Sequence, residues 1–266
     1  MPYLKTSGAT LYHECHGDGP PLMLIAGIAS DSQSWLPVAE TLSHDFTLIL
    51  PDNRGAGRTR TEEEALSIDA MADDCAALIA HLGHERVHVV GHSMGGAIAQ
   101  SLAIRYPQHV DHLVLAATGA KMSMRNRVLF DDLNALRQSG VDMLLWYKML
   151  FQWLFRPAFF EDERAVSGAA EQALAYPHAQ TSGNFSHQLA AAMAVDHHDD
   201  LGRITAPTLV LTAAQDLLFH HQDAQALVDA IADARLQVID NAAHSLHWDN
   251  PQEFCAALRG FLLQRM

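Results

Sequence analysis

Basic residues are scarce in this sequence. Its 266 residues include 17 lysines and arginines against 31 aspartates and glutamates, which gives a formal net charge of −14. Nucleic acids and anionic membrane surfaces are bound by clustered Lys and Arg side chains. This charge balance therefore argues against a nucleic-acid partner and against adhesion to an anionic membrane.

Cysteines are also few, and the three present, Cys15, Cys75 and Cys255, are odd in number and far apart. Disulfide frameworks need paired cysteines and zinc sites need short characteristic spacings, so neither is predicted. The first eight residues contain no basic segment followed by an apolar one, so a secretory signal is not expected. We therefore expect a cytoplasmic protein.

A long uninterrupted apolar run is absent as well. The most apolar stretch, residues 143–160, carries Lys148, Gln152 and Arg156 at intervals of four, which places them on one side of a helix. Pro157 then ends that helix. Because a membrane span needs about 20 mostly apolar residues, this stretch is predicted to be an amphipathic helix with a broad buried face.

Short apolar runs alternate with helical patterns through the first 120 residues. Helical spacing is clearest over 68–82, between a candidate N-cap at Ser67 and a candidate stop at Gly83. Strand candidates, mostly continuous apolar runs typical of strands covered on both faces, lie at residues 11–15, 22–26, 47–50, 87–90 and 113–116. Repeated βαβ units of this kind predict an α/β fold with a mostly parallel sheet flanked by helices.

The alternation stops after residue 120, and residues 121–200 read almost entirely as helix. Strand signals and a final helix then follow, at residues 208–212, 236–239 and 251–263. The predicted organisation is therefore an α/β core made of residues 1–120 and 201–266, with residues 121–200 inserted as a helical cap.

Residues 91–95 read Gly-His-Ser-Met-Gly, directly after the predicted strand at 87–90 and before a predicted helix at 97–106. A sharp strand-to-helix turn of this kind forces its central residue into strained dihedral angles and exposes its side chain above the sheet. Side chains two positions away would collide with the turn, which accounts for both glycines. Ser93 is therefore the predicted nucleophile, and the N-terminus of the following helix favours an anion beside it.

A serine hydroxyl needs a base to remove its proton and an acid to hold that base, in the chain order Ser, acid, His for this kind of elbow. Asp216 closely follows the strand at 208–212 and is therefore predicted to lie at the same edge of the sheet as Ser93. Asp223 and Asp240 are rival acids that fit less well, since they fall in the next helix and at the end of the last strand.

The predicted base is His244, just beyond the last strand, where a loop can bring an imidazole between the serine and the acid. His247, three residues on, is its competitor. The developing oxyanion needs two backbone N–H donors. We expect them to be the amide of Met94, directly after the nucleophile, and that of Ile28, in the loop after the strand at 22–26.

These residues together resemble the α/β-hydrolase superfamily over essentially the whole chain. Residues 52–59 (Asp-Asn-Arg-Gly-Ala-Gly-Arg-Thr) are similar to the family's Asp-x-Arg-Gly-x-Gly-x-Ser loop, and residues 206–211 and 244–254 are similar to its segments before the acid and after the histidine. The resemblance implies that 52–59 is mainly structural and that 121–200 covers the site. One departure is Ala26-Gly27, where the family usually has His-Gly before the oxyanion residue.

The reaction predicted from these parts is hydrolysis of a carboxylic ester or lactone through an acyl-enzyme, on a partly apolar small-molecule substrate. Size and motifs are similar to those of 3-oxoadipate enol-lactonase-like and small carboxylesterase-like proteins. No cofactor or metal ion is required. A carbon–carbon bond hydrolase, a thioesterase or an acyltransferase would use the same triad and stays an alternative. A non-catalytic ligand-binding homologue is a further one, against which the intact Ser-Asp-His order counts.

Two other patterns are interpreted as structural. The run 197–200, His-His-Asp-Asp, is read as a solvated hinge rather than a metal site, because adjacent residues rarely converge on one ion. Aromatic residues of the predicted cap are read as its core, part of which could also line an apolar pocket; they are Trp146, Tyr147, Phe151, Trp153, Phe155, Phe159 and Phe160. The sequence predicts no oligomeric state.

Overall fold

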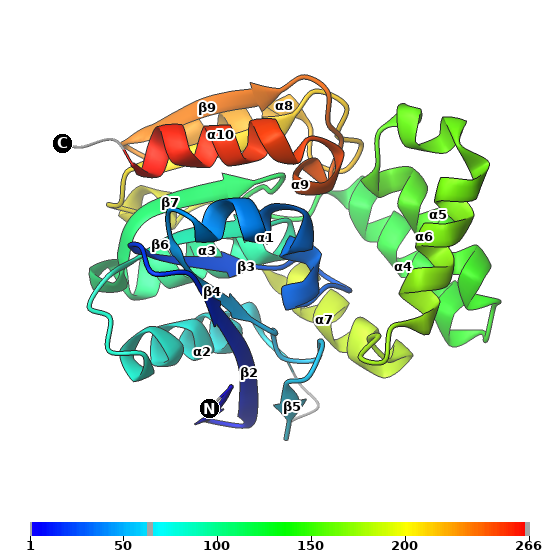
Figure 1. The fold of residues 1–266 in the computed structure, drawn as a ribbon, viewed down its shortest axis with the longest axis horizontal. Helices are drawn as coiled ribbons and strands as arrows, with labels where there is room; N and C mark the ends of the chain where they lie inside the picture. Colours follow the sequence, from blue (N-terminus) through cyan, green and yellow to red (C-terminus); the bar gives the residue numbers. More distant parts are fainter. Residues whose placement is uncertain (1, 63–65, 264–266) are drawn as a thin grey trace.

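The computed structural model describes residues 2–62 and 66–263. Its centre is a twisted sheet with the strand order β1-β2-β4-β3-β6-β7-β8-β9, and β5 pairs with β2 (Figure 1). From β4 to β9 every neighbouring pair is parallel, whereas β2 is antiparallel to its neighbours. The strands are β1 (Tyr3–Thr6), β2 (Ala9–His16), β3 (Pro21–Ile25), β4 (Thr47–Pro51), β5 (Arg60–Thr61), β6 (Val87–His92), β7 (Val110–Ala116), β8 (Thr208–Ala213) and β9 (Ala234–Ile239).

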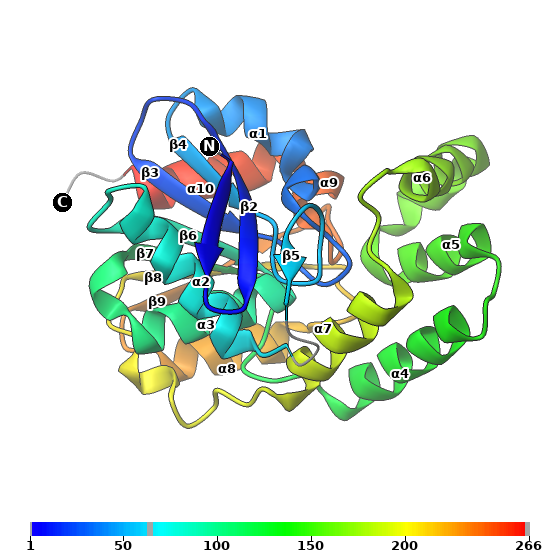
Figure 2. The same cartoon turned by 90° about the horizontal axis from the view of Figure 1, so that it is seen from below.

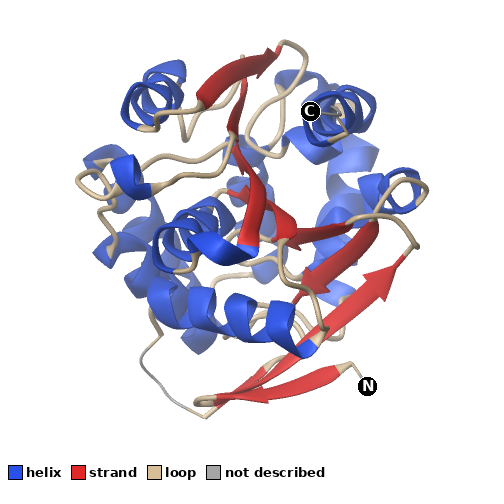
Figure 3. Ribbon diagram, turned by 90° about the vertical axis from the view of Figure 1, so that its left-hand side faces the viewer, coloured by secondary structure: helices blue, strands red, loops and turns tan. Residues whose placement is uncertain are grey.

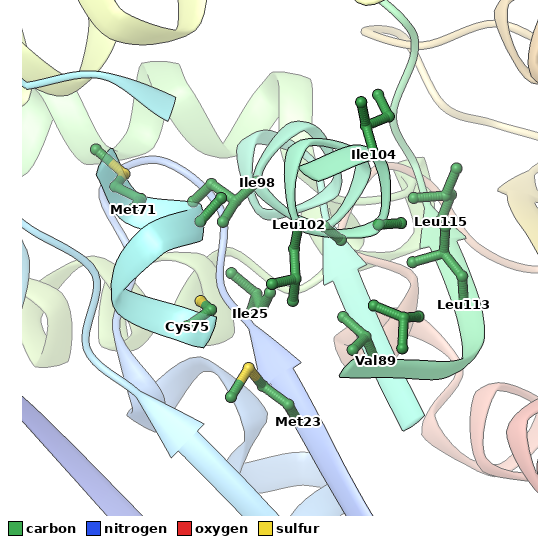
Figure 4. Packing of buried hydrophobic residues seen from close by; sticks show 14 of the residues in the cluster. Met23, Ile25, Met71, Cys75, Val89, Ile98, Leu102, Ile104, Leu113 and Leu115 are labelled. Carbon is green, nitrogen blue, oxygen red and sulfur yellow. The ribbon is translucent and has the colours of Figure 1, made fainter. Parts of the chain in front are cut away.

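Helices cover both faces of this sheet (Figure 3). One face packs against α2 (Ile68–His81), α3 (Met94–Arg105) and α8 (His221–Ala230), and the other packs against α1 (Leu36–Ser43), α9 (Leu246–Asp249) and α10 (Pro251–Leu262). Every residue of β6 is buried, as expected for a strand covered on both sides. Figure 4 shows the first of these two cores, where Leu102 of α3 lies next to Ile25 of β3.

Local sequence signals set the ends of these helices. Ser67 adopts an extended backbone and its hydroxyl accepts a hydrogen bond from the Ala70 amide, which caps the first turn of α2. Gly83, directly after the C-cap of the same helix, has a φ of 77°, which favours glycine. The α/β fold, with its mostly parallel sheet flanked by helices, is therefore confirmed.

Between β7 and β8 the chain forms a helical insertion, α4 to α7, which lies to one side of the sheet (Figures 1 and 2). It has a core of its own, to which Phe130, Trp146 and Phe185 contribute. Its elements are α4 (Met124–Gln138), α5 (Met143–Leu154), η3 (Pro157–Glu161), α6 (Glu163–Ala175) and α7 (Ser182–Ala194). Helix α5 ends before Pro157, and one of its sides is buried. Among residues 2–62 and 66–263, no helix is long and apolar enough to cross a bilayer.

The loop at 52–59 is tied into the core by hydrogen bonds. Asp52 is fully buried, and its carboxylate accepts from the amides of Ser32 and Arg58 at 2.9 and 2.7 Å. Arg54 forms a two-pronged ion pair with Asp74 of α2, with N···O distances of 2.6 and 3.0 Å and side chains only 4% and 3% exposed. These contacts agree with a structural role for the loop.

Replacing Asp74 by alanine is expected to lower the free energy of unfolding by about 3–5 kcal/mol, because it removes the buried carboxylate that forms the two-pronged ion pair with Arg54. Urea denaturation monitored by circular dichroism measures this loss. The matched control is Asp196→Ala, which breaks an exposed pair with Lys121 and should cost less than about 1 kcal/mol. Equal losses in the two variants would contradict the prediction.

Candidate active site

Ser93 lies at the junction of β6 and α3 with φ 55° and ψ −119°, a conformation that L-residues rarely adopt. Three contacts hold it there: its amide donates to the Ala116 carbonyl at 3.0 Å, while its own carbonyl accepts from the Gly96 amide and the Thr118 hydroxyl. A backbone of this kind costs about 1–3 kcal/mol, and the surrounding contacts maintain it. Its side chain stays partly accessible at the carboxyl edge of the sheet.

Both glycines of the elbow are required by close backbone approaches. A Cβ on Gly95 would lie 2.1 Å from the Ile25 carbonyl oxygen, and a Cβ on Gly91 would lie 2.2 Å from the Gly95 carbonyl oxygen. Gly27 faces the serine, since a Cβ there would lie 3.2 Å from Ser93 Cβ. The elbow can therefore sit tightly on β3 only with this glycine pattern.

Asp216 and His244 come together as an acid–imidazole pair. His244 Nδ1 lies 3.1 Å from Asp216 Oδ2, and both side chains are buried. Asp216 Oδ1 accepts from the amides of Leu218 and Phe219 at 2.7 and 3.1 Å. Burial raises the pKa of Asp216, but the charge and hydrogen bond of His244 and the two amides outweigh it, so this pKa is below its ordinary value. The carboxylate is therefore ionised and oriented at neutral pH.

Ser93 and His244 line the same hollow, which also has Ile28 in its wall. A second hollow is lined by Ile28, Ser93 and Met94. Each has a volume of about 40 Å³, well below the roughly 300–1,000 Å³ of a typical ligand pocket. The space around Ser93 is therefore small in this conformation.

The two amides predicted for the oxyanion both border the second hollow. Met94 is the first residue of α3, so its N–H has no partner within the helix. Ile28 precedes Ala29, whose φ of 59° marks another strained backbone position in the loop after β3. Neither amide donates a hydrogen bond to any residue in the described part of the chain, so both are free to receive an anion.

The rival residues lie elsewhere. Asp223 caps the start of α8, where its carboxylate accepts from the His220 amide at 2.8 Å. Asp240 is exposed after β9. His247 is buried in α9, with its ring 4.6 Å from that of Trp35. Of the three candidate acids, Asp216 is the one that pairs with His244.

Two residues that the sequence patterns did not single out support the His244 loop. His92 Nε2 lies 2.9 Å from the His244 carbonyl oxygen and donates to it, and the two rings are 4.9 Å apart. Asp249 accepts from the amides of Ala243 and Arg156. The signals that could have found them are the place of His92 next to Ser93 and that of Asp249 in the segment after His244.

His92 is buried, and this burial, together with the nearby His244, lowers its pKa from the ordinary 6.5 to about 3. Between these values the unfolded chain binds a proton on this ring and the folded chain does not, so stability falls as pH decreases below about 6.5. From His92 alone, the free energy of unfolding should be about 2 kcal/mol smaller at pH 5 than at pH 7. Urea denaturation at both pH values measures it.

In His92→Gln this part of the pH dependence should disappear, because the proton uptake is lost. His221→Gln, which changes an exposed histidine of α8, is the matched control and should keep the full dependence. An unchanged difference between pH 7 and pH 5 in His92→Gln would show that this ring is not the source.

The helical insertion contributes the apolar wall of the first hollow, through Phe130, Leu150, Leu154 and Phe185. None of the seven aromatic residues singled out from the sequence lines either hollow. Several of them contact one another instead; for example, the ring centroids of Trp146 and Tyr147 are 5.3 Å apart. They form part of the insertion's own packing.

A much larger hollow, of about 580 Å³, lies outside the Ser93 site, between α2, α3 and α7. Its charged residues are engaged in ion pairs, among them Arg105 with Asp73 at 2.7 Å and Arg203 with Asp200 at 2.9 Å. No serine there lies beside an acid-held histidine of the kind found at His244. The candidate active site is therefore placed at Ser93 because of the residues that lie there and not because of the volume of the hollow.

Comparisons with known proteins agree with this arrangement. The model of a family described as "alpha/beta hydrolase fold" matches residues 20–251. A protein of Agrobacterium fabrum named "Putative carbamate hydrolase RutD" is 32% identical over 259 residues, which cover 95% of this chain and 98% of that one. A thermophilic esterase from Thermogutta terrifontis has a TM-score of 0.84 and 26% identity, covering 98% of this chain and 96% of that one.

The enol-lactonase from Burkholderia xenovorans LB400 has a TM-score of 0.89 over 99% of this chain and 100% of that one, at 22% identity. At that identity the likeness concerns the fold. Together with the family match, it extends the similarity across both the sheet and the helical insertion.

Proposed function

Because this chain belongs to the α/β-hydrolase family and is a hydrolase, we propose that it cleaves a small carboxylic ester or lactone through an acyl-enzyme on Ser93. The observation that carries the proposal is the geometry of the pair behind the serine. A buried, ionised Asp216 holds Nδ1 of His244, and His244 shares a hollow with Ser93. Serine hydrolysis needs this division of roles between nucleophile, base and orienting acid.

In the proposed reaction, His244 Nε2 takes the proton of Ser93 as Oγ attacks the substrate carbonyl. Asp216 accepts a hydrogen bond from Nδ1–H of His244, which keeps the proton of the neutral ring on Nδ1 and leaves Nε2 free to act as a base. The amides of Ile28 and Met94 stabilise the oxyanion, worth about 3–4 kcal/mol for each well-placed donor. The imidazolium then protonates the leaving alcohol, and water, activated by the same histidine, releases the acid.

The size of the site favours a short substrate. Two hollows of about 40 Å³ flank Ser93, and the wall from α4, α5 and α7 is apolar. We propose that residues 121–200 serve as a cap that limits the size of the acyl and alcohol groups that the site accepts. So small a space favours a short, partly apolar acyl group over a long chain.

Carbamate hydrolysis is the second candidate, since a relative of 32% identity bears that name. The same serine would attack a carbamate carbonyl, and the same two amides would hold the oxyanion. The nitrogen of a carbamate donates its lone pair to the carbonyl, which is therefore less electrophilic than an ester carbonyl. A carbamoyl-enzyme should thus form and break down more slowly than an acyl-enzyme. Cleavage of a thioester or of a carbon–carbon bond would use the same residues, and the substrate panel below includes both reactions.

A substrate panel with the full chain tests the proposal: p-nitrophenyl acetate, butyrate and octanoate, a five-membered lactone, an aryl carbamate, an acyl thioester and a vinylogous diketone. We expect acetate turnover well above the background of Ser93→Ala and a fall in kcat/KM from acetate to octanoate. A preference for the carbamate would select the second candidate. The absence of Ser93-dependent turnover throughout would contradict hydrolysis and leave a ligand-binding role.

A further inference from the structure

Two histidines and an aspartate meet at the end of the sheet opposite Ser93. His88 lies near the start of β6, and Asp111 and His112 lie at the start of the neighbouring β7. Asp111 Oδ2 is 3.3 Å from His88 Nδ1 and 3.0 Å from His112 Nδ1. All three ligand atoms lie within 4.8 Å of one another. The cluster is outside the hydrolytic site.

An irregularity in the strand pairing makes this convergence possible. Val87 pairs with Val110 and Val89 pairs with Leu113, so His88 is opposed by two residues, Asp111 and His112. Neighbouring residues of a regular strand point to opposite faces. A bulge removes that alternation locally, and here it lets two adjacent side chains of β7 face one imidazole of β6.

Two of the three separations between these atoms are close to those of a metal site. In tetrahedral coordination with Zn–N and Zn–O bonds of about 2.0–2.2 Å, ligand atoms lie about 3.3–3.5 Å apart. The two separations from Asp111 Oδ2, 3.0 and 3.3 Å, are close to this value. We propose that His88, Asp111 and His112 bind a divalent transition-metal ion, for which Zn²⁺ suits the nitrogen and oxygen donors best.

An unpartnered buried atom supports the assignment independently. The His88 side chain is 9% exposed, and its Nδ1 makes no hydrogen bond with any residue that the structure describes, although Asp111 is near. A buried ring nitrogen without a partner is costly, and a metal ion placed between it and the carboxylate would satisfy it.

The surroundings leave room for a fourth ligand. Asp111 is 38% exposed, so water can complete the coordination from the solvent side. Arg86 lies 3.8 Å from Oδ1 of Asp111 and donates to the Val110 carbonyl oxygen at 2.9 Å, so it leaves Oδ2, the oxygen beside the two imidazoles, to the ion. A bound ion would join β6 to β7 at the end of the sheet away from the elbow, so its effect should be on stability and not on ester hydrolysis.

The test uses the full chain without a histidine tag, titrated with Zn²⁺ by calorimetry and with Co²⁺ by visible absorption. We expect one ion per chain, intense Co²⁺ bands typical of tetrahedral coordination, and a rise in Tm of about 5 °C when free Zn²⁺ is about 100 times its Kd. Asp111→Asn, which is nearly isosteric, and His112→Ala should each weaken binding by at least about 10-fold.

The matched control is His198→Ala, which removes an exposed histidine from the run 197–200. It should bind Zn²⁺ as the unaltered chain does. Undiminished binding in both Asp111→Asn and His112→Ala would overturn the proposal, as would loss of binding in His198→Ala alone or the absence of any binding. Ester turnover with and without a chelator is a separate readout, so failure of the metal site and failure of the proposed hydrolysis can be told apart.

Discussion

Replacement of Ser93 by alanine is expected to lower kcat for p-nitrophenyl acetate by at least about 10⁴-fold while the protein stays folded. The change removes only the hydroxyl oxygen, and the contacts that hold the elbow are made by backbone atoms of Ser93. The amides of Ile28 and Met94 and the Asp216–His244 pair stay in place. What is lost is the nucleophile itself, and no acyl-enzyme can form.

Two measurements check this result together. Steady-state kinetics give the fall in kcat, and a fluorophosphonate probe followed by mass spectrometry reports whether any serine is still modified. Ser30→Ala is the matched control, because Ser30 lines the same hollow as Ser93, and it should retain labelling. Persistent labelling of Ser93→Ala at another residue would reject Ser93 as the nucleophile.

The elbow could be predicted from the sequence because its constraints are local. Two glycines flank the serine at fixed spacing, and a Cβ on either of them would lie 2.1 or 2.2 Å from a backbone carbonyl oxygen. The acid and the base were predicted from their places after strands, since the carboxyl ends of parallel strands meet at one edge. The place of Asp216 directly after a strand, as against that of Asp223 in the next helix, was therefore enough to select Asp216.

Features that depend on pairing between distant segments could not be predicted. Strands β1 and β5 lie at the antiparallel side of the sheet and carry no continuous apolar run. The pairing of Arg54 with Asp74 joins a loop to a helix 20 residues away. The bulge that turns Asp111 and His112 to one side depends on the register between β6 and β7, which no local pattern contains.

The role of the insertion at the site could not be predicted from the sequence either. Its aromatic content predicted a packed core and left open which residues face the substrate. In the structure the wall of the hollow is made by Phe130, Leu150, Leu154 and Phe185, of which only the two phenylalanines are aromatic. Helical periodicity gives the buried face of each helix, but not which part of that face meets the core domain and which part meets a ligand.

Asp216→Asn is expected to reduce kcat by about 10⁴-fold, almost as severely as loss of the nucleophile, although it replaces one oxygen by nitrogen. Oδ1 of Asp216 accepts hydrogen bonds from two amides, those of Leu218 and Phe219. An asparagine must therefore place its carbonyl oxygen there and turn its NH₂ group toward His244 Nδ1.

That orientation makes Nδ1 an acceptor and moves the proton of the neutral ring to Nε2, the atom that should act as the base. The imidazole keeps its position and loses its function, so KM should change little while kcat falls. The control is Asp223→Asn. The carboxylate of Asp223 caps α8 outside the site, so this variant should keep nearly full activity. Because both amides on Oδ1 are donors, only a carboxylate can satisfy them and also accept from Nδ1; near-normal turnover in Asp216→Asn would show that His244 is not the base.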